Sequence, residues 1–195
     1  MEKLAKVIGV GKNGIRIAQQ FPDHGFSGKT HYSTLAISVS KKDLELTTIE
    51  RKIQLDTECC LKTMTNDEVT NGRMILENNV STVTKNIGRS EYVLIVADFG
   101  CGISAGIASQ LANVLDNLGI NAFCLVIKPP KSAGGNALGN YLEGTTFLTT
   151  QLTAYFEFVI ADSPYNTARS RIPSNKGFDL VQQEIIKKIY ALFEF

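Results

Sequence analysis

The sequence predicts an α/β fold: a parallel, Rossmann-like sheet covered by helices in a three-layer arrangement. Short apolar runs alternate with longer segments whose hydrophobic residues lie three or four positions apart, which is typical of strands joined by crossover helices. The run Tyr92–Ala97 (YVLIVA) is apolar throughout, as expected of a strand buried on both faces. Two strand-to-helix turns are rich in glycine, at Gly9–Gly14 and Gly100–Gly106.

Six strands are expected. The first runs into the first glycine turn, the fourth into the second, and the fifth stops at Pro129–Pro130, because proline cannot continue the ladder of hydrogen bonds. In chain order the expected strands are Lys6–Gly11, Thr34–Val39, Lys52–Leu55, Tyr92–Ala97, Asn121–Ile127 and Phe156–Ala161.

The segments between them have helical periodicity. The first helix carries Ile15, Ile17, Ala18 and Phe21. The next, Asn66–Ile87, turns Val69, Met74, Ile75 and Val83 inward. A third follows the second glycine turn, with Ile107, Leu111, Val114, Leu115 and Leu118 on one face. Glycine-rich Lys131–Gly139 is interpreted as a loop before a helix at Tyr141–Thr153. A long amphipathic C-terminal helix is expected over Phe178, Val181, Ile185, Ile189 and Leu192.

Composition limits the class of protein. The 195 residues are 44% hydrophobic, enough for one globular domain over residues 1–195 and too much for a disordered chain. Twenty Lys and Arg against nineteen Asp and Glu give a formal charge of +1, so no overall field favours nucleic acid or an acidic membrane surface. The apolar runs are too short to span a bilayer, and the first twenty residues offer no secretory segment. We therefore expect a cytoplasmic protein.

No metal site is predicted from the ligand-type residues. The four cysteines include no C-x-x-C pair, and two histidines at positions 24 and 31 do not complete a zinc site. Reduced thiols fit the cytoplasm.

The first glycine turn, Gly9–Gly14 (GVGKNG), matches G-x-G-x-x-G. It follows a strand and opens a helix, so glycine would let the backbone approach a ligand and the helix N-terminus would offer free N–H groups to phosphate. Alone, the motif is a weak signal, because a tight turn that binds nothing also needs glycine.

The second turn, Gly100–Gly106 (GCGISAG), also lies between an apolar strand and a helix. Ligands of open parallel sheets bind at the carboxyl ends of strands, where the helices begin. Two glycine turns at strand ends can therefore converge on one phosphate chain, which favours nucleotide binding over two unrelated tight turns.

Taken in order, these segments resemble the FtsZ/tubulin family of GTPases. KVIGVG resembles the family's first loop, K-V-I-G-V-G-G-G-G, and GCGISAG resembles its signature loop, G-G-G-T-G-T-G. The family's K-x-Q-L-G, T-K-P and the A-F that enters its central helix are matched by Lys52–Asp56 (KIQLD), Ile127–Pro129 (IKP) and Gly177–Phe178. The resemblance runs from Lys6 to about Leu192.

The resemblance implies a nucleotide site. Ile103 and Ala105 replace the two threonines of the signature loop, and Ser104 replaces the glycine between them. Gln182 matches the family's acid or amide that contacts the base, and Phe178 is a candidate either to stack on the base or to pack in the core. The residues assigned to nucleotide binding are Gly9, Gly11, Lys12, Asn13, Gly14, Gly100, Cys101, Gly102, Ser104, Gly106, Phe178 and Gln182.

The implied function is binding of GTP or GDP, with Mg²⁺ as a candidate ion. In the family, the loop after the central helix supplies the acids for hydrolysis, and a second domain follows. This sequence ends in or just after that helix, so we expect a nucleotide-binding domain alone, with little hydrolysis and no catalytic residue of its own. Apolar Leu192, Phe193 and Phe195 on the last helix suggest a homo-oligomer or a protein partner.

Two alternatives stay open. The same fold could be a scaffold with an empty pocket that works through protein contacts. The chain could also be an NAD(P)-binding Rossmann domain, with Ser40–Lys42 near a 2′-phosphate. At Asp98, after the fourth strand, the carboxylate is interpreted as a cap for the glycine turn or as a metal-linked acid.

Overall fold

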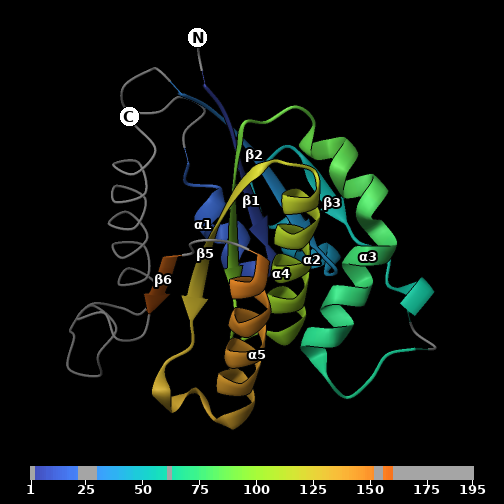
Figure 1. The fold of residues 1–195 in the computed structure, drawn as a ribbon, viewed down its shortest axis with the longest axis vertical. Coiled ribbons are helices and arrows are strands. Elements are labelled where there is room, and N and C mark those ends of the chain that lie inside the picture. Colours follow the sequence, from blue (N-terminus) through green and yellow to red (C-terminus); the bar gives the residue numbers. More distant parts are fainter. Residues whose placement is uncertain (1–2, 22–29, 61–62, 152–155, 160–195) are drawn as a thin grey trace.

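The computed structural model describes residues 3–21, 30–60, 63–151 and 156–159, which form a six-stranded sheet between two layers of helices (Figure 1). All neighbouring strands are parallel, in the order β3-β2-β1-β4-β5-β6. The predicted α/β class is therefore confirmed. The strands are β1 (Lys3–Val10), β2 (Thr30–Ser38), β3 (Lys52–Gln54), β4 (Tyr92–Asp98), β5 (Asn121–Lys128) and β6 (Phe156–Val159).

The helices are divided between the two faces of the sheet. Figure 1 shows α3, α4 and α5 on one face, with α1 and α2 behind. Alternate residues of β1 follow this division: Ile8 packs in the core under α3–α5, whereas Val7 packs in the core under α1. The helices are α1 (Gly11–Ala18), α2 (Lys41–Glu45), α3 (Glu68–Ile87), α4 (Gly102–Asn117) and α5 (Gly135–Gln151).

Strand order explains this division. From β1 the chain moves outward through β2 to β3, and it then crosses back to β4 and continues through β5 to β6. Because parallel crossovers are right-handed, a reversal of direction transfers the connecting helix to the opposite face. The reversal lies between β1 and β4, so the turns after these two strands open into the same crevice.

α3 and α4 pack with their backbones almost in contact. A Cβ atom at Gly106 would lie 2.9 Å from both Arg73 N and Gly72 Cα, and it would overlap Val69 O. A Cβ at Gly72 would in turn lie 3.0 Å from Gly106 Cα. Glycine is therefore required at this crossing by the close approach of two helices.

The beginning and end of α3 have separate local causes. Asp67 caps its N-terminus by accepting a hydrogen bond from the Val69 N–H at 3.0 Å, and the Thr70 hydroxyl helps to hold the pKa of Asp67 below its usual value. At the C-terminus the buried Lys6 ammonium donates to the Asn86 carbonyl at 3.0 Å, and Gly88 follows with a φ of 63°.

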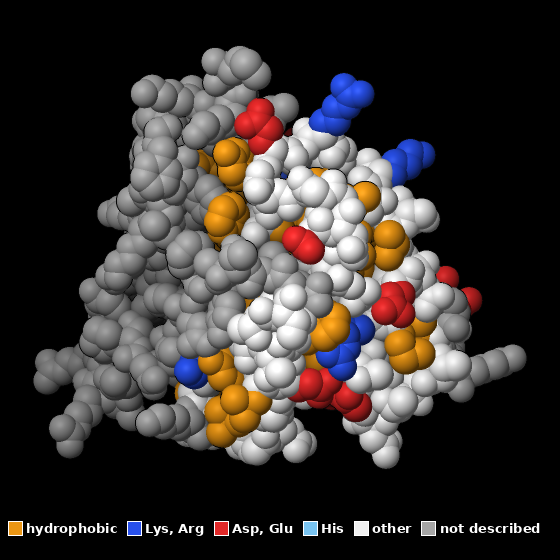
Figure 2. Space-filling view, viewed as in Figure 1, with side chains coloured by type: hydrophobic (Ala, Val, Ile, Leu, Met, Phe, Trp, Pro, Cys, Tyr) orange, Lys and Arg blue, Asp and Glu red, His pale blue; other side chains and the backbone are white. Residues whose placement is uncertain are grey.

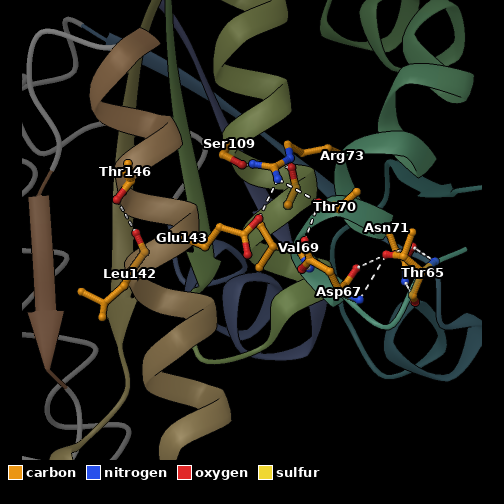
Figure 3. A network of polar contacts seen from close by, with 11 residues as sticks. Thr65, Asp67, Val69, Thr70, Asn71, Arg73, Ser109, Leu142, Glu143 and Thr146 are labelled. Atoms are coloured by element: carbon orange, nitrogen blue, oxygen red, sulfur yellow. Dashed lines mark hydrogen bonds and ion pairs between the residues drawn. The ribbon is translucent and has the colours of Figure 1, made fainter.

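A polar network joins α3 to α5 (Figure 3). Arg73 Nη2 donates to Glu143 Oε1 at 2.6 Å and to Thr70 Oγ1 at 3.0 Å, and its guanidinium lies 4.9 Å from the centre of the Phe147 ring. The Arg73 side chain is only 20% exposed, so this pair is less screened than a surface ion pair. It holds α5 in place beside α3.

Several sequence predictions need correction. Lys131–Gly139 is not a loop: a 3₁₀ turn at Lys131–Ala133 is followed by α5 from Gly135. Burial of Tyr141 and Leu148 outweighs the weak helix propensity of its glycines. The short helix α2, capped by the Ser40 hydroxyl, was not predicted, because five residues show no periodicity.

Predicted helix faces are confirmed in most positions. Val69, Ile75 and Val83 of α3 and Ile107, Leu111 and Leu115 of α4 are buried. Leu118 is an error: it is the C-cap of α4 and 56% exposed. The last predicted helix, with Phe178, Gln182, Leu192, Phe193 and Phe195, lies outside the described residues.

We predict opposite effects of the same substitution at two helical glycines. Gly106→Ala should destabilise the protein by about 3 kcal/mol, because the new methyl group overlaps the backbone of α3. Gly139→Ala in α5 is the matched control, with no neighbouring atom within 4 Å, and should stabilise by about 1 kcal/mol through helix propensity. Urea unfolding measures both; equal effects would contradict the packing argument.

Candidate functional site

A pocket of about 240 Å³ lies at the carboxyl ends of β1, β2 and β4, where the strand order reverses. Three chain segments line it. The turn after β1 and the segment from the end of β4 into α4 supply most of the lining, and the end of β2 with α2 supplies the rest. The residues are Gly11, Lys12, Asn13, Ser38, Val39, Asp43, Asp98, Cys101, Ile103, Ser104 and Ile107.

The first turn places Gly11 at the pocket. Gly11 is the first residue of α1 and has a φ of 67°, and a Cβ atom there would collide with the Ser104 hydroxyl. Both the backbone angle and the neighbouring chain therefore require glycine. Lys12 is exposed at the mouth of the pocket, and Asn13 lies deeper.

The second turn places Cys101 and Ser104 at the pocket. Cys101 is the exposed N-cap residue of α4, and Ser104 is buried one turn into that helix. The Ser104 hydroxyl lies 3.5 Å from Cys101 Sγ. Ser104 thus lies beside both Cys101 and Gly11, and all three line the pocket.

Two helix N-termini open into this pocket without any acidic cap. Neither α1 nor α4 has a side-chain cap or an acidic residue in its first turn. By contrast, α2 is capped by Ser40 with Asp43 in its first turn, and α3 is capped by Asp67 with Glu68. Uncapped N-termini present free N–H groups and partial positive charge. The pocket therefore offers donors to an anion from two directions.

Asp98 connects the two turns. Its Oδ2 accepts a hydrogen bond from Asn13 Nδ2 at 2.6 Å, and its Oδ1 accepts from the Gly100 N–H at 2.9 Å. The second contact is the capping interaction that the sequence indicates. The first joins residues 85 positions apart, and no local pattern in the sequence indicates it.

Most of the other predicted glycines pack elements together and do not line the pocket. Cβ atoms at Gly9 and Gly14 would overlap α1 and β4, respectively. A Cβ at Gly102 would overlap Glu68 of α3, Gly106 lies at the crossing with α3, and Gly100 lies beside Pro129. Of the residues predicted to bind nucleotide, the structure brings Gly11, Lys12, Asn13, Cys101 and Ser104 together; Phe178 and Gln182 are outside the described residues.

The end of β2 and helix α2 contribute residues to the pocket that were not predicted from the sequence. Ser38 donates to Asp43 Oδ2 at 3.1 Å, and both line the pocket opposite Ser104. One feature of the sequence could have indicated this contribution: the second predicted strand is parallel to the first, so its carboxyl end is expected at the same edge of the sheet. Lys41 and Lys42, considered for a 2′-phosphate, are exposed and do not line the pocket. Asp43 does, and its carboxylate would repel such a group.

The described residues show neither a metal cluster nor a membrane-spanning helix. No three of their His, Cys, Asp and Glu side chains lie close enough together to hold an ion. No helix in this part of the chain has both the length and the apolar character needed to cross a bilayer. On the face viewed in Figure 2, charged and hydrophobic side chains of the described residues are interspersed with polar ones.

The chain is similar to known proteins in two comparisons, with a family model and with solved structures. The family model described as "Tubulin/FtsZ family, GTPase domain" matches residues 5–159. A comparison with curated proteins found no match. Among solved structures, CetZ2 from Haloferax volcanii, a GTPγS-bound protofilament, is 18% identical with a TM-score of 0.78; the match covers 98% of this chain and 58% of that one.

Two further structures have the same fold. An empty FtsZ dimer from M. jannaschii is 18% identical with a TM-score of 0.80, and the match covers 100% of this chain and 55% of that one. The TubZ subunit from bacteriophage PhiKZ is 15% identical with a TM-score of 0.68, with 96% and 60% covered. The chain thus spans less than two thirds of the length of each of these structures.

We predict that Gly11→Ala destabilises the protein by about 2 kcal/mol, from backbone strain and from collision with the Ser104 hydroxyl. Ser104→Ala removes only the colliding oxygen. A double-mutant cycle followed by urea unfolding should therefore recover part of the loss in the Gly11→Ala/Ser104→Ala protein. Strict additivity of the two changes would show that the two side chains do not meet.

Proposed function

This chain belongs to the tubulin/FtsZ family, and on that premise we propose that it binds a guanine nucleotide, GTP or GDP, with its phosphates in the pocket between Gly11 and Ser104. The observation that carries the proposal is the pair of uncapped helix N-termini, of α1 and α4, that open into one pocket. Phosphate would supply the negative charge that no side chain supplies in either first turn.

The size of the pocket defines which part of the ligand it takes. About 240 Å³ is less than the roughly 300–1,000 Å³ of sites that enclose whole small molecules. It is enough for phosphates, so the base and ribose would extend beyond these lining residues. Lys12 at the mouth and the Ser104 hydroxyl are the side-chain donors proposed for the phosphates. Gln182 and Phe178 remain the proposed base contacts.

Mg²⁺ does not fit a protein cage here. The described residues offer no group of three acidic or other metal ligands, and both oxygens of Asp98 already accept hydrogen bonds. Any Mg²⁺ would enter on the nucleotide phosphates, as is usual for this ion.

We also propose little hydrolysis by the chain on its own. Asp43 and Asp98 are the two carboxylates that line the pocket. Asp43 accepts from the Ser38 hydroxyl and Asp98 accepts from Asn13 and Gly100. These contacts orient each carboxylate toward protein donors, so we assign the role of general base to neither.

Assembly is the second part of the proposed function. A protofilament and a dimer are among the similar structures, which supports a homo-oligomer or a stable protein partner for this chain. A single nucleotide-binding domain in the cytoplasm is proposed with it.

The alternative of a scaffold with an empty pocket is favoured by one observation, the Asp98 carboxylate between the two turns.

Cys101→Asp tests the proposed phosphate site, because it should raise the stability of the protein and lower its affinity for nucleotide. Aspartate is a good N-cap, so it should stabilise α4 by about 1 kcal/mol, and its charge should weaken GTP and GDP binding at least tenfold. Calorimetric titration with GTP, GDP, ATP and NADPH, together with thermal melting, measures both. Cys101→Ser is the neutral control and should retain binding. Wild-type protein that binds no guanine nucleotide would favour the scaffold, and preference for NADPH would favour the Rossmann alternative.

The same variant controls a test of hydrolysis. Wild-type protein incubated with GTP and Mg²⁺ should release phosphate no faster than Cys101→Asp, which should bind GTP at least tenfold more weakly, because both pocket carboxylates are held by protein donors. Faster release by the wild type alone would reveal a catalytic group.

A further inference from the structure

In the described part of the chain, Asp98 is the acidic side chain with hydrogen bonds to residues of both glycine turns. It ends β4, its carboxylate is partly exposed, and it is held by Asn13 from the first turn and by the Gly100 N–H from the second. Each of these contacts ends on a different carboxylate oxygen. One donor of the pocket lining, the Asn13 amide, and one N–H of the second turn are therefore occupied by an anion that the chain itself provides.

We propose that Asp98 is a built-in anion of this pocket: it occupies donors of the two turns and lowers the affinity for phosphate groups. The effect increases with the charge of the ligand. The identity of the ligand as a guanine nucleotide rests on the proposed function, whereas the effect on phosphate groups rests on the carboxylate and its contacts alone.

The charges around the pocket support this role. Its ionisable side chains at neutral pH are one cation, Lys12, and two carboxylates, Asp43 and Asp98. The N-termini of α1 and α4 add partial positive charge of roughly half an elementary charge each. Asp98 offsets part of that field, so each further phosphate charge meets a pocket that is already nearly neutral.

Asp98 differs from Asp43 in what it touches. Asp43 accepts from Ser38 on the β2 side and, within the described residues, has no hydrogen bond to either glycine turn. Both residues carry one negative charge and both line the pocket. Neutralising each in turn therefore separates the effect of a carboxylate held by both turns from the effect of a carboxylate elsewhere in the lining.

A purely structural role of Asp98 can be distinguished from an effect of its charge, because an amide can replace the carboxylate in the turn. In Asp98→Asn the side-chain oxygen can still accept from the Gly100 N–H. Asn13 can rotate its amide and offer its oxygen to the new NH₂ group. The two turns would stay joined while the charge is lost. Asp98→Ser is a second variant, with a smaller hydroxyl that also caps turns.

The experiment compares wild type, Asp98→Asn, Asp98→Ser and Asp43→Asn by calorimetric titration with GTP, GDP, GMP and inorganic pyrophosphate. Thermal melting checks that each variant is folded. We expect Asp98→Asn to bind GTP about tenfold more tightly than wild type, with a smaller gain for GDP and the smallest for GMP. Asp98→Ser should show the same order. Asp43→Asn should gain clearly less, and pyrophosphate should follow GTP.

Each outcome has one meaning. If folded Asp98→Asn and Asp98→Ser gain no affinity for any of the four probes, or lose affinity, the proposal is overturned. An equal gain in Asp43→Asn also overturns it, since charge alone would then explain the effect. If no variant binds a nucleotide but both Asp98 variants gain affinity for pyrophosphate, the built-in anion stands and the guanine-nucleotide proposal fails.

Discussion

The reversal of strand order between β1 and β4 is the constraint on which the rest of this structure depends. Right-handed crossovers require α1 and α2 on one face and α3, α4 and α5 on the other once the direction changes. The same reversal leaves the turns after β1 and β4 side by side, without a crossover between them to cover the crevice. The location of the pocket is thus a consequence of topology, and the side chains decide only what the pocket can hold.

Close backbone packing accounts for most of the glycines in the two motifs. Gly9, Gly14, Gly102 and Gly106 lie where a Cβ atom would overlap a neighbouring strand or helix, and Gly11 alone combines a left-handed backbone angle with a position in the pocket lining. Glycines at a strand-to-helix turn therefore indicate first that the helix packs closely against the sheet. They favour ligand binding only indirectly, because close packing places the free N–H groups of the helix at the end of the strand.

The electrostatic character of the pocket results from two features: the first turns of α1 and α4 carry no acidic residue, and Asp98 adds one carboxylate beside them. Two helix N-termini lack acidic caps at the pocket, although the remaining capped helices show that this sequence uses Ser and Asp caps elsewhere. Asp98 then returns one negative charge to the same place, held by donors from both turns. The charge of the pocket thus depends on these local features rather than on the chain's net charge of +1.

The sequence by itself determined the parallel α/β class, the approximate bounds of β1, β3, β4, β5 and α3, and the two glycine turns that lie at the pocket, because hydrophobic periodicity and glycine positions are local signals. Only the tertiary structure decided that α5 begins at Gly135, since burial of Tyr141 and Leu148 outweighs local propensity. The tertiary structure also showed which glycines serve packing and that Gly11 lines the pocket. It placed Ser38 and Asp43 in the pocket lining and revealed the hydrogen bond between Asn13 and Asp98. These contacts connect residues far apart in the chain, and their geometry exists only after the sheet has assembled.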